Sequence, residues 1–145
     1  MHYFAYGSNM NLEHMRRLCG WHFQVVGAAE LKHYEFGVDL RGYFNIRPKD
    51  ESSVWGVLFE IDDKALAALD EWEGYPEVFG RGEVSISGPA QKEYRSWVYV
   101  EAADQFGGDK INQDYYRRVT AGARENYLPP EWLKMLENLN KLANG

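Results

Sequence analysis

The sequence lacks the features of a secreted, disulfide-bonded or membrane-spanning chain. It has a single cysteine, Cys19, so no disulfide can form within the chain, and a lone thiol fits a reducing compartment. No run approaches the ~18 apolar residues that a membrane-spanning helix needs. The start of the chain has no basic segment followed by an apolar run, so no secretion signal is expected. These absences predict a cytoplasmic protein that does not associate with membranes.

Basic clusters are also missing. The formal net charge is −6, and the only neighbouring arginines are the pairs Arg16-Arg17 and Arg117-Arg118. A protein that binds nucleic acid through its phosphates normally presents a basic stripe or patch. We therefore expect no nucleic-acid partner.

Familiar cofactor and nucleophile motifs are absent as well. The chain has neither the G-x-G-x-x-G pattern of dinucleotide sites nor the G-x-S-x-G pattern of serine hydrolases. Its histidines have no metal-ligand spacing, and no cysteine pair accompanies them. They are His2, His14, His22 and His33. Cys19 stands among apolar residues of a predicted helix, where a small packing side chain is expected. We expect no metal and no cofactor.

What remains is the pattern of one folded domain spanning residues 1–145, in which 45 % of the residues are apolar. Apolar alternation predicts strands at residues 2–6, 21–40, 54–61, 80–87 and 93–101. A period of three to four predicts helices at 12–19, 62–73 and 112–126 and a last helix from Pro130. Residues 42–49 look like a looser connection. Strands that come first, with helices inserted and appended, indicate an α+β protein with a barrel-like mixed sheet.

The first predicted strand runs directly into the turn Gly7-Ser8-Asn9. A glycine after a buried strand lets the backbone approach a ligand closely, because it has no Cβ. If Asn11 caps the next helix, the turn's amides lie near that helix's positive end, where they can hold a carboxylate or phosphate. Tyr6 would form a wall of this site. The same residues also make an ordinary strand-to-helix turn, and composition alone favours that simpler interpretation.

Three carboxylates end the helix predicted at residues 62–73: Asp70, Glu71 and Glu73. Carboxylates in a last turn face the negative end of the helix dipole, which raises their pKa. Asp70 and Glu71 are expected on the solvated face, opposite the leucines of the helix. Glu73 lies next to Trp72 and near Tyr75, whose rings would desolvate its carboxyl group and prepare it to act as a base. On the residues alone, a structural role for this cluster is still preferred.

Four segments taken together carry a family resemblance. They are Phe4-Ala5-Tyr6-Gly7-Ser8-Asn9, Val54-Trp55-Gly56-Val57-Leu58, Leu69-Asp70-Glu71-x-Glu73-Gly74 and Gly122-Ala123-Arg124-Glu125-Asn126. In this order, over almost the whole chain, they resemble the γ-glutamylcyclotransferase family, including its butirosin-pathway and AIG2-like branches. The resemblance implies a small mixed β-barrel flanked by helices. It also implies an enzyme that cleaves a γ-glutamyl compound and leaves 5-oxoproline, a reaction of the lyase or acyltransferase type.

The resemblance also assigns roles by position. The family's catalytic glutamate corresponds to Glu73, which would take a proton from the substrate's α-ammonium and give it to the leaving nitrogen. The substrate-cradling loop corresponds to Tyr6, Gly7, Ser8 and Asn9. This loop would hold either the α-carboxylate or the developing oxyanion. A tyrosine that orients the substrate falls on Tyr115 or on Tyr116. A small γ-glutamyl molecule is the implied partner, with neither metal nor cofactor, and the oligomeric state is not predicted.

Two departures from the family pattern concern the substrate rather than the reaction. Phe79 stands where many relatives have a tyrosine, so a hydroxyl contact to the substrate would be missing. Tyr127 replaces a small residue and would narrow the pocket on the side of the leaving amine. Two alternatives stay open. The chain would be a non-catalytic binding protein for γ-glutamyl or other acidic metabolites or a protein partner, or an enzyme for a γ-glutamylated lysine side chain or a biosynthetic intermediate.

Overall fold

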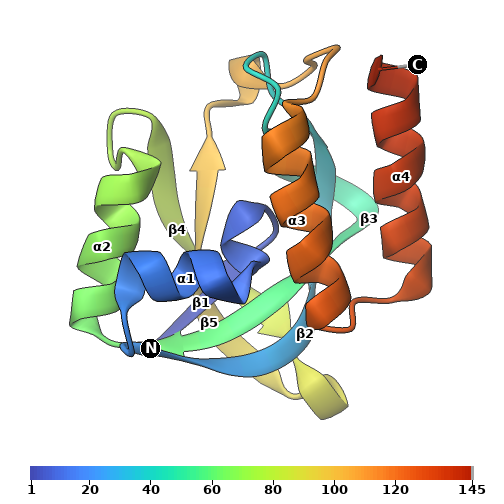
Figure 1. The fold of residues 1–145 in the computed structure, drawn as a ribbon. Coiled ribbons are helices and arrows are strands. Elements are labelled where there is room, and N and C mark those ends of the chain that lie inside the picture. The colour runs from blue at the N-terminus through green and yellow to red at the C-terminus, as the bar shows by residue number, and fades with distance from the viewer. Residues whose placement is uncertain (145) are drawn as a thin grey trace.

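The computed structural model describes residues 1–144, and Figure 1 shows its elements in chain order. The strands are β1 (His2–Ala5), β2 (Phe23–Val38), β3 (Phe44–Ile61), β4 (Phe79–Ser87) and β5 (Glu93–Glu101). The helices are α1 (Leu12–Cys19), α2 (Asp63–Glu73), α3 (Gln113–Glu125) and α4 (Pro130–Asn144). Short 3₁₀ turns are η1 (Ser8–Met10), η2 (Pro89–Gln91) and η3 (Ala103–Gln105). Each strand and helix expected from the sequence is present.

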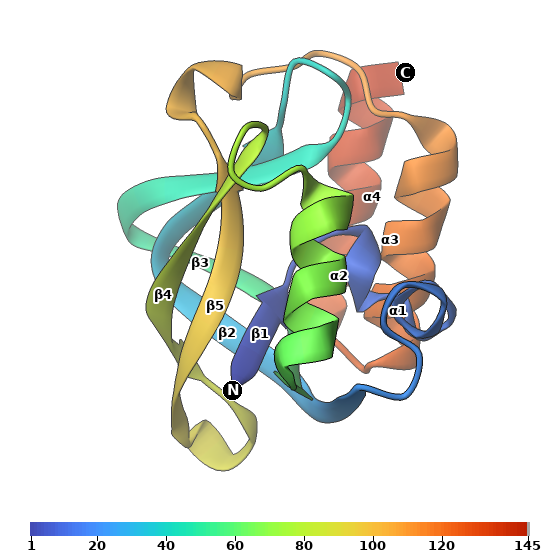
Figure 2. The ribbon, with the colours of Figure 1, turned by 90° about the vertical axis from the view of Figure 1, so that its left-hand side faces the viewer.

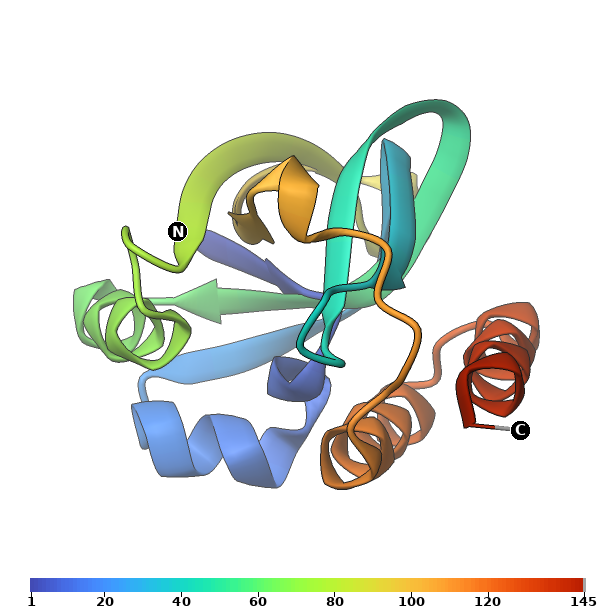
Figure 3. The same ribbon diagram turned by 90° about the horizontal axis from the view of Figure 1, so that it is seen from above.

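The strands within residues 1–144 close into one barrel in the order β1-β3-β2-β4-β5. Neighbouring strands are antiparallel except β1 and β5, which run parallel. The helices lie on one side of the barrel and the β4–β5 ribbon on the other (Figure 2 and Figure 3). This arrangement confirms the prediction of an α+β fold with a small mixed β-barrel flanked by helices.

The prediction of a loose connection at residues 42–49 is wrong, because β3 already begins at Phe44 and pairs with β2 along this segment. Ile46 is completely buried in the barrel. Pro48 lies opposite Tyr34, next to a shift in the strand register. Proline is tolerated where a ladder is interrupted, because no hydrogen bond from its nitrogen is then required.

The helix starts follow from capping residues, of which the sequence had suggested Asn11. The side chains of Asn11, Asp62 and Asn112 each accept a hydrogen bond of 3.0 Å from a backbone amide three residues further on. Gly74 ends α2 in the left-handed conformation, at φ 70° and ψ 35°, which glycine adopts without strain. None of the helices in residues 1–144 has the length and apolar character needed to cross a bilayer.

The packing of β1 in the barrel core fixes the position of the turn that follows this strand. Phe4 and Leu58 are completely buried. A Cβ on Gly56 would lie 2.3 Å from the carbonyl oxygen of Ala5, so the glycine permits the close approach of β1 and β3. At the end of β1 the chain enters η1, which lies against α1 and α3 (Figure 1). The barrel therefore holds the Gly7-Ser8-Asn9 turn between helices at one end of β1.

Candidate active site

A pocket of about 480 Å³ opens where η1, the end of α2 and the start of α3 meet. Its volume lies within the roughly 300–1,000 Å³ that is typical of small-molecule sites. The site residues expected from the sequence all line it: Tyr6, Gly7, Ser8, Asn9, Glu73 and Tyr115. The fold thus brings the first turn, the end of the second helix and the start of the third into one cavity.

Glu73 is the last residue of α2 and turns its carboxyl group toward the first turn. Asn9 Nδ2 donates a hydrogen bond of 3.0 Å to Glu73 Oε1 and a second one of 2.8 Å to Tyr3 Oη. Burial raises the pKa of Glu73 to about 7, although the Asn9 hydrogen bond and the positive charge of Arg41 act in the opposite direction. A carboxyl group with this pKa can gain or lose a proton near neutral pH.

The first turn has backbone amides that its own hydrogen bond does not use. The first hydrogen bond within the turn runs from Met10 N to Gly7 O, at 3.1 Å. The amides of Ser8 and Asn9 come before Met10 in the chain, so this hydrogen bond does not use them. Both side chains are buried. A Cβ on Gly7 would lie 2.6 Å from Tyr115 Oη. Glycine at position 7 thus leaves room for the Tyr115 hydroxyl to pack against the turn.

Tyr115 closes the pocket from the side of α3. Phe44 N donates a hydrogen bond of 3.2 Å to Tyr115 Oη, and the ring packs on Tyr43 at a centroid distance of 4.8 Å. Burial raises the pKa of Tyr115 well above its ordinary value, so the hydroxyl keeps its proton. Tyr116, the other position considered from the sequence, is not among the described residues that line the pocket. The Tyr6 hydroxyl donates a hydrogen bond of 2.6 Å to the backbone carbonyl of Tyr99.

The end of α3 fastens the first turn in place. Asn126 Nδ2 donates hydrogen bonds of 2.8 Å to Met10 O and to Gly122 O. A Cβ on Gly122 would lie 2.6 Å from Asn11 N, so only glycine allows the helix to approach the turn this closely. Glu125 Oε1 accepts a hydrogen bond of 2.7 Å from Leu12 N. The Gly-Ala-Arg-Glu-Asn segment therefore positions the turn and does not enter the pocket.

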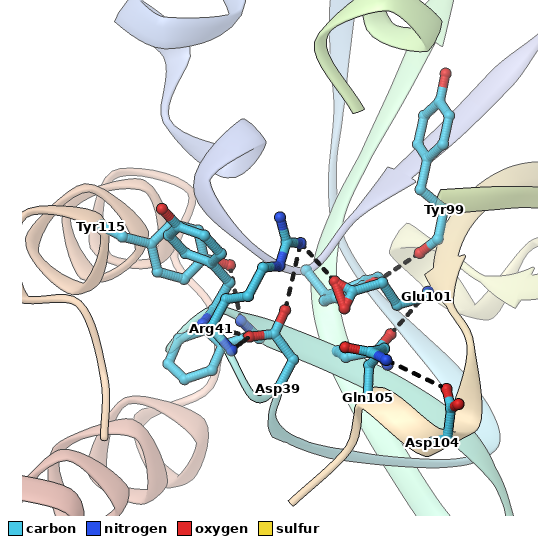
Figure 4. Close-up of polar contacts among 11 residues, drawn as sticks. Asp39, Arg41, Tyr99, Glu101, Asp104, Gln105 and Tyr115 are labelled. Carbon is cyan, nitrogen blue, oxygen red and sulfur yellow. Dashed lines mark hydrogen bonds and ion pairs between the residues drawn. The ribbon is translucent and has the colours of Figure 1, made fainter. Parts of the chain in front are cut away.

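A second polar cluster beside the pocket was missed by sequence reasoning (Figure 4). Arg41 Nη2 lies 2.5 Å from Glu101 Oε1 and 3.6 Å from Asp39 Oδ2. Asp39 Oδ1 also accepts hydrogen bonds from the amides of Arg41 and Tyr43, at 2.8 and 2.9 Å. Both carboxylates are almost completely buried, whereas Arg41 is half-exposed and lines the pocket. No local sequence signal connects positions 39 and 101.

The two carboxyl groups of this cluster share one guanidinium. The pKa of Glu101 is raised to about 7, because burial and a hydrogen bond with Asp39 outweigh the lowering effect of Arg41. A protonated Glu101 can donate a hydrogen bond to Asp39, while Arg41 contacts both side chains. The two carboxyl groups therefore hold the Arg41 guanidinium at the edge of the pocket.

Asp70 does not lie on the solvated face of α2, where the sequence had suggested it. It accepts a hydrogen bond of 2.6 Å from Tyr99 Oη and forms an ion pair of 3.0 Å with Arg81 Nε. The reason is the helix period, because position 70 follows Leu66 by four residues and so falls on the same face. Glu71 is exposed, as expected, and lies at the rim of the pocket.

The two departures from the family pattern have different positions. Phe79 is buried and lines the pocket. Tyr127 is 88 % exposed, belongs to the connection between α3 and α4, and is not among the described residues that line the pocket. The expectation that Tyr127 narrows the pocket is therefore wrong, because its side chain points into solvent.

The remaining nucleophile and metal candidates lie elsewhere or do not form a site. Cys19 is buried, and burial raises the pKa of its thiol to about 11, so little thiolate is present at neutral pH. Among residues 1–144, no group of three or more histidine, cysteine, aspartate and glutamate side chains is arranged to hold a metal ion.

The sequence is similar to those of known γ-glutamylcyclotransferases. Residues 3–118 match the family model described as gamma-glutamyl cyclotransferase, AIG2-like. A gamma-glutamylcyclotransferase from Bos taurus is 28 % identical over 148 residues, which cover 94 % of this chain and 77 % of the relative. One from Mus musculus is 29 % identical over 149 residues, which cover 93 % and 76 %.

Solved structures share the fold. A structure described as gamma-glutamyl cyclotransferase superposes on this chain with a TM-score of 0.85, covering 94 % of this chain and 86 % of the other. The sequence identity between the two is 24 %. At that identity the likeness concerns the barrel and its helices, and the residues of the pocket must be judged by their own geometry.

Proposed function

Because the chain belongs to the gamma-glutamyl cyclotransferase, AIG2-like family, we propose that it is an enzyme that cleaves a γ-glutamyl amide into 5-oxoproline and a free amine or amino acid. One observation carries the proposal. The Glu73 carboxyl group, whose pKa burial raises to about 7, lies in the pocket within hydrogen-bond distance of Asn9 on the first turn. A carboxyl group in that setting suits proton transfer near neutral pH.

The proposed reaction needs no nucleophile from the protein, because the substrate carries its own. The α-amino nitrogen attacks the γ-carbonyl carbon, a new carbon–nitrogen bond closes the five-membered lactam, and the bond to the leaving nitrogen breaks. The two protons that the attacking nitrogen loses end on the leaving nitrogen, so neither water nor an oxidant is consumed. The protein supplies a folded substrate conformation, a proton carrier and donors for the oxyanion.

Glu73 is proposed as the proton carrier. In the tetrahedral intermediate both nitrogens are bonded to the same carbon, so one carboxyl group can reach both of them. With a pKa of about 7, Glu73 is present as both carboxylate and acid near neutrality. The carboxylate takes a proton from the attacking nitrogen, and the resulting acid delivers it to the leaving nitrogen.

The first turn is proposed as the anion cradle. The amides of Ser8 and Asn9 are not used by the internal hydrogen bond of η1, and both residues line the pocket together with Glu73, so these amides suit the α-carboxylate or the oxyanion. Tyr115 Oη accepts a hydrogen bond from Phe44 N and keeps its own proton to donate, which suits a role in orienting the substrate. Tyr6 forms part of the wall.

The direct test measures 5-oxoproline released from a panel of γ-glutamyl amino acids, γ-glutamyl amines and glutathione. We expect turnover of at least one compound, and a loss of about 10²- to 10⁴-fold in Glu73→Gln, which is the usual effect of removing a general acid–base group. Glu77→Gln is the matched control, because Glu77 is exposed and belongs to the loop that follows α2. Binding of these compounds without any 5-oxoproline would instead identify a non-catalytic binding protein.

A further inference from the structure

The last turn of α2, which carries Glu73, is attached to the β4–β5 ribbon through Asp70. The helix itself packs chiefly on α1 and β3. Asp70 precedes Glu73 by three residues, so the two side chains are neighbours on the helix. Asp70 Oδ1 accepts a hydrogen bond of 2.6 Å from Tyr99 Oη on β5 and lies 3.0 Å from Arg81 Nε on β4. One carboxyl group of this turn thus lines the pocket, and the other joins the turn to the ribbon.

The guanidinium of Arg81 contacts two aromatic rings in addition to Asp70. Its central carbon lies 4.6 Å from the ring centroid of Tyr75 and 4.4 Å from that of Trp97. The side chain is only 15 % exposed. An ion pair shielded in this way is screened less by water and salt than a surface pair, and the planar guanidinium can stack and pair at the same time. Arg81 is therefore a fixed connection and not a mobile surface charge.

The same contacts hold the loop that follows α2. Tyr75 N donates a hydrogen bond of 2.9 Å to Asp70 O, and Val78 N donates one of 2.8 Å to Gly74 O. Gly74 and Val78 line the pocket, whereas Arg81 is not among the described residues that do so. Any effect of Arg81 on the reaction must therefore pass through the last turn of α2 and this loop.

We propose that Arg81 is a positioning residue for Glu73. This inference rests on the proposed function. The contacts of Arg81 with Asp70 and Tyr75 keep the last turn of α2, which would otherwise fray as helix ends do, in one place against the barrel. The Glu73 carboxyl group then stays within hydrogen-bond reach of Asn9. Proton transfer depends on such placement, because a displacement of about 1 Å can lower a rate by about 10²-fold.

Replacing Arg81 by methionine removes the ion pair and keeps an unbranched apolar side chain. We expect Arg81→Met to lower kcat by about 10- to 100-fold for the compound of the panel that the wild type turns over fastest. KM should change little, because no contact to the substrate is removed. Arg81→Lys should recover part of the loss, since the charge that pairs with Asp70 is kept and the stacking is not.

Arg95→Met is the matched control and should keep the wild-type kcat. Arg95 lies on β5, forms an ion pair of 3.4 Å with Glu83 across the same ribbon, is 71 % exposed and does not line the active-site pocket. A loss in Arg95→Met as large as that in Arg81→Met would mean that the ribbon as a whole matters and would overturn the assignment. A raised KM with an unchanged kcat in Arg81→Met would overturn it too, because Arg81 would then shape the binding wall.

A double variant separates positioning from general support of the pocket. In the Glu73→Gln background, with enzyme in excess over substrate, Arg81→Met should lower the residual rate no further, because no proton carrier remains to be positioned. A full additional loss would overturn the assignment. If thermal unfolding shows that Arg81→Met does not fold, Arg81→Lys takes its place in the same comparison.

The proposed function and this inference fail in different ways. A wild type that releases no 5-oxoproline from any compound of the panel would refute the proposed function, and this inference with it. An active wild type together with an equally active Arg81→Met would overturn the positioning role alone.

Discussion

Two carboxyl groups beside the pocket, Glu73 and Glu101, have the same raised pKa of about 7 but opposite surroundings. Glu73 accepts one hydrogen bond, from a neutral amide, and faces the cavity. Glu101 is 4 % exposed and is bound to Arg41 and Asp39. A raised pKa alone therefore does not identify a catalytic base. Glu73 lines the pocket and forms no ion pair with any described residue, and these two features distinguish it from Glu101, which holds Arg41.

Replacing Glu73 and Glu101 by glutamine, one at a time, should give the largest difference in kcat between the two sites. Glu73→Gln is expected to lower kcat for 5-oxoproline release by about 10²- to 10⁴-fold. Glu101→Gln should change it by less than about 10-fold, because a glutamine amide can accept from Arg41 and donate to Asp39 as the protonated acid does. Steady-state kinetics of both variants would measure this, and comparable losses in the two would contradict the distinction.

A change of shape close to Glu73, with no change of charge, should have the next largest effect. In Gly7→Ala the new Cβ would lie 2.6 Å from Tyr115 Oη and displace the turn that holds Asn9. We expect kcat/KM to fall by about 10- to 100-fold, as displacements of about 1 Å in a site can do. Gly82→Ala is the control, because a Cβ there meets nothing within 4 Å.

The same substitution should be almost harmless when the tyrosine hydroxyl is absent. Gly7→Ala combined with Tyr115→Phe is expected to have nearly the kcat/KM of Tyr115→Phe alone, since the clash is relieved. A full additional loss in the double variant would show that the glycine matters for another reason.

The smallest expected effect concerns the stability of the protein and comes from Glu101. The pKa of Glu101 is about 7 when folded, above the ordinary carboxyl range of the unfolded chain, so the folded protein binds this proton more tightly. This contribution to the free energy of unfolding is present at low pH and is lost as the pH rises through about 7. Glu101→Gln should therefore flatten the fall in stability between pH 5 and pH 8, measured by urea unfolding. An unchanged slope would contradict the shift.

The sequence predicted the fold well where local signals decide it. Asn11, Asp62 and Gly74 marked helix ends because capping depends on side chains within three residues of the end. Residues 42–49 were misjudged because their local sequence has no clear strand pattern, and only the pairing with β2 makes a strand there. Tertiary pairing overrode local propensity.

The candidate site was predictable only in part. Glu73 and the first turn were found through family resemblance, since no local pattern indicates that positions 9 and 73 lie together. The cluster of Asp39, Arg41 and Glu101 gave no signal, because its members come from a turn and a strand that the barrel alone brings into contact. Long-range polar contacts of this kind depend on the closed sheet, and the periodicity of a single strand does not contain them.

The pH dependence of kcat/KM is the most direct test of the claim that Glu73 carries the proton. With γ-glutamyl-alanine, or whichever compound of the panel is turned over, the wild type should show a limb that rises with pH through a midpoint near 7, the pKa of Glu73. The residual activity of Glu73→Gln should lack that limb. A wild-type profile that is flat from pH 5 to pH 8, or the same limb in Glu73→Gln, would contradict the assignment.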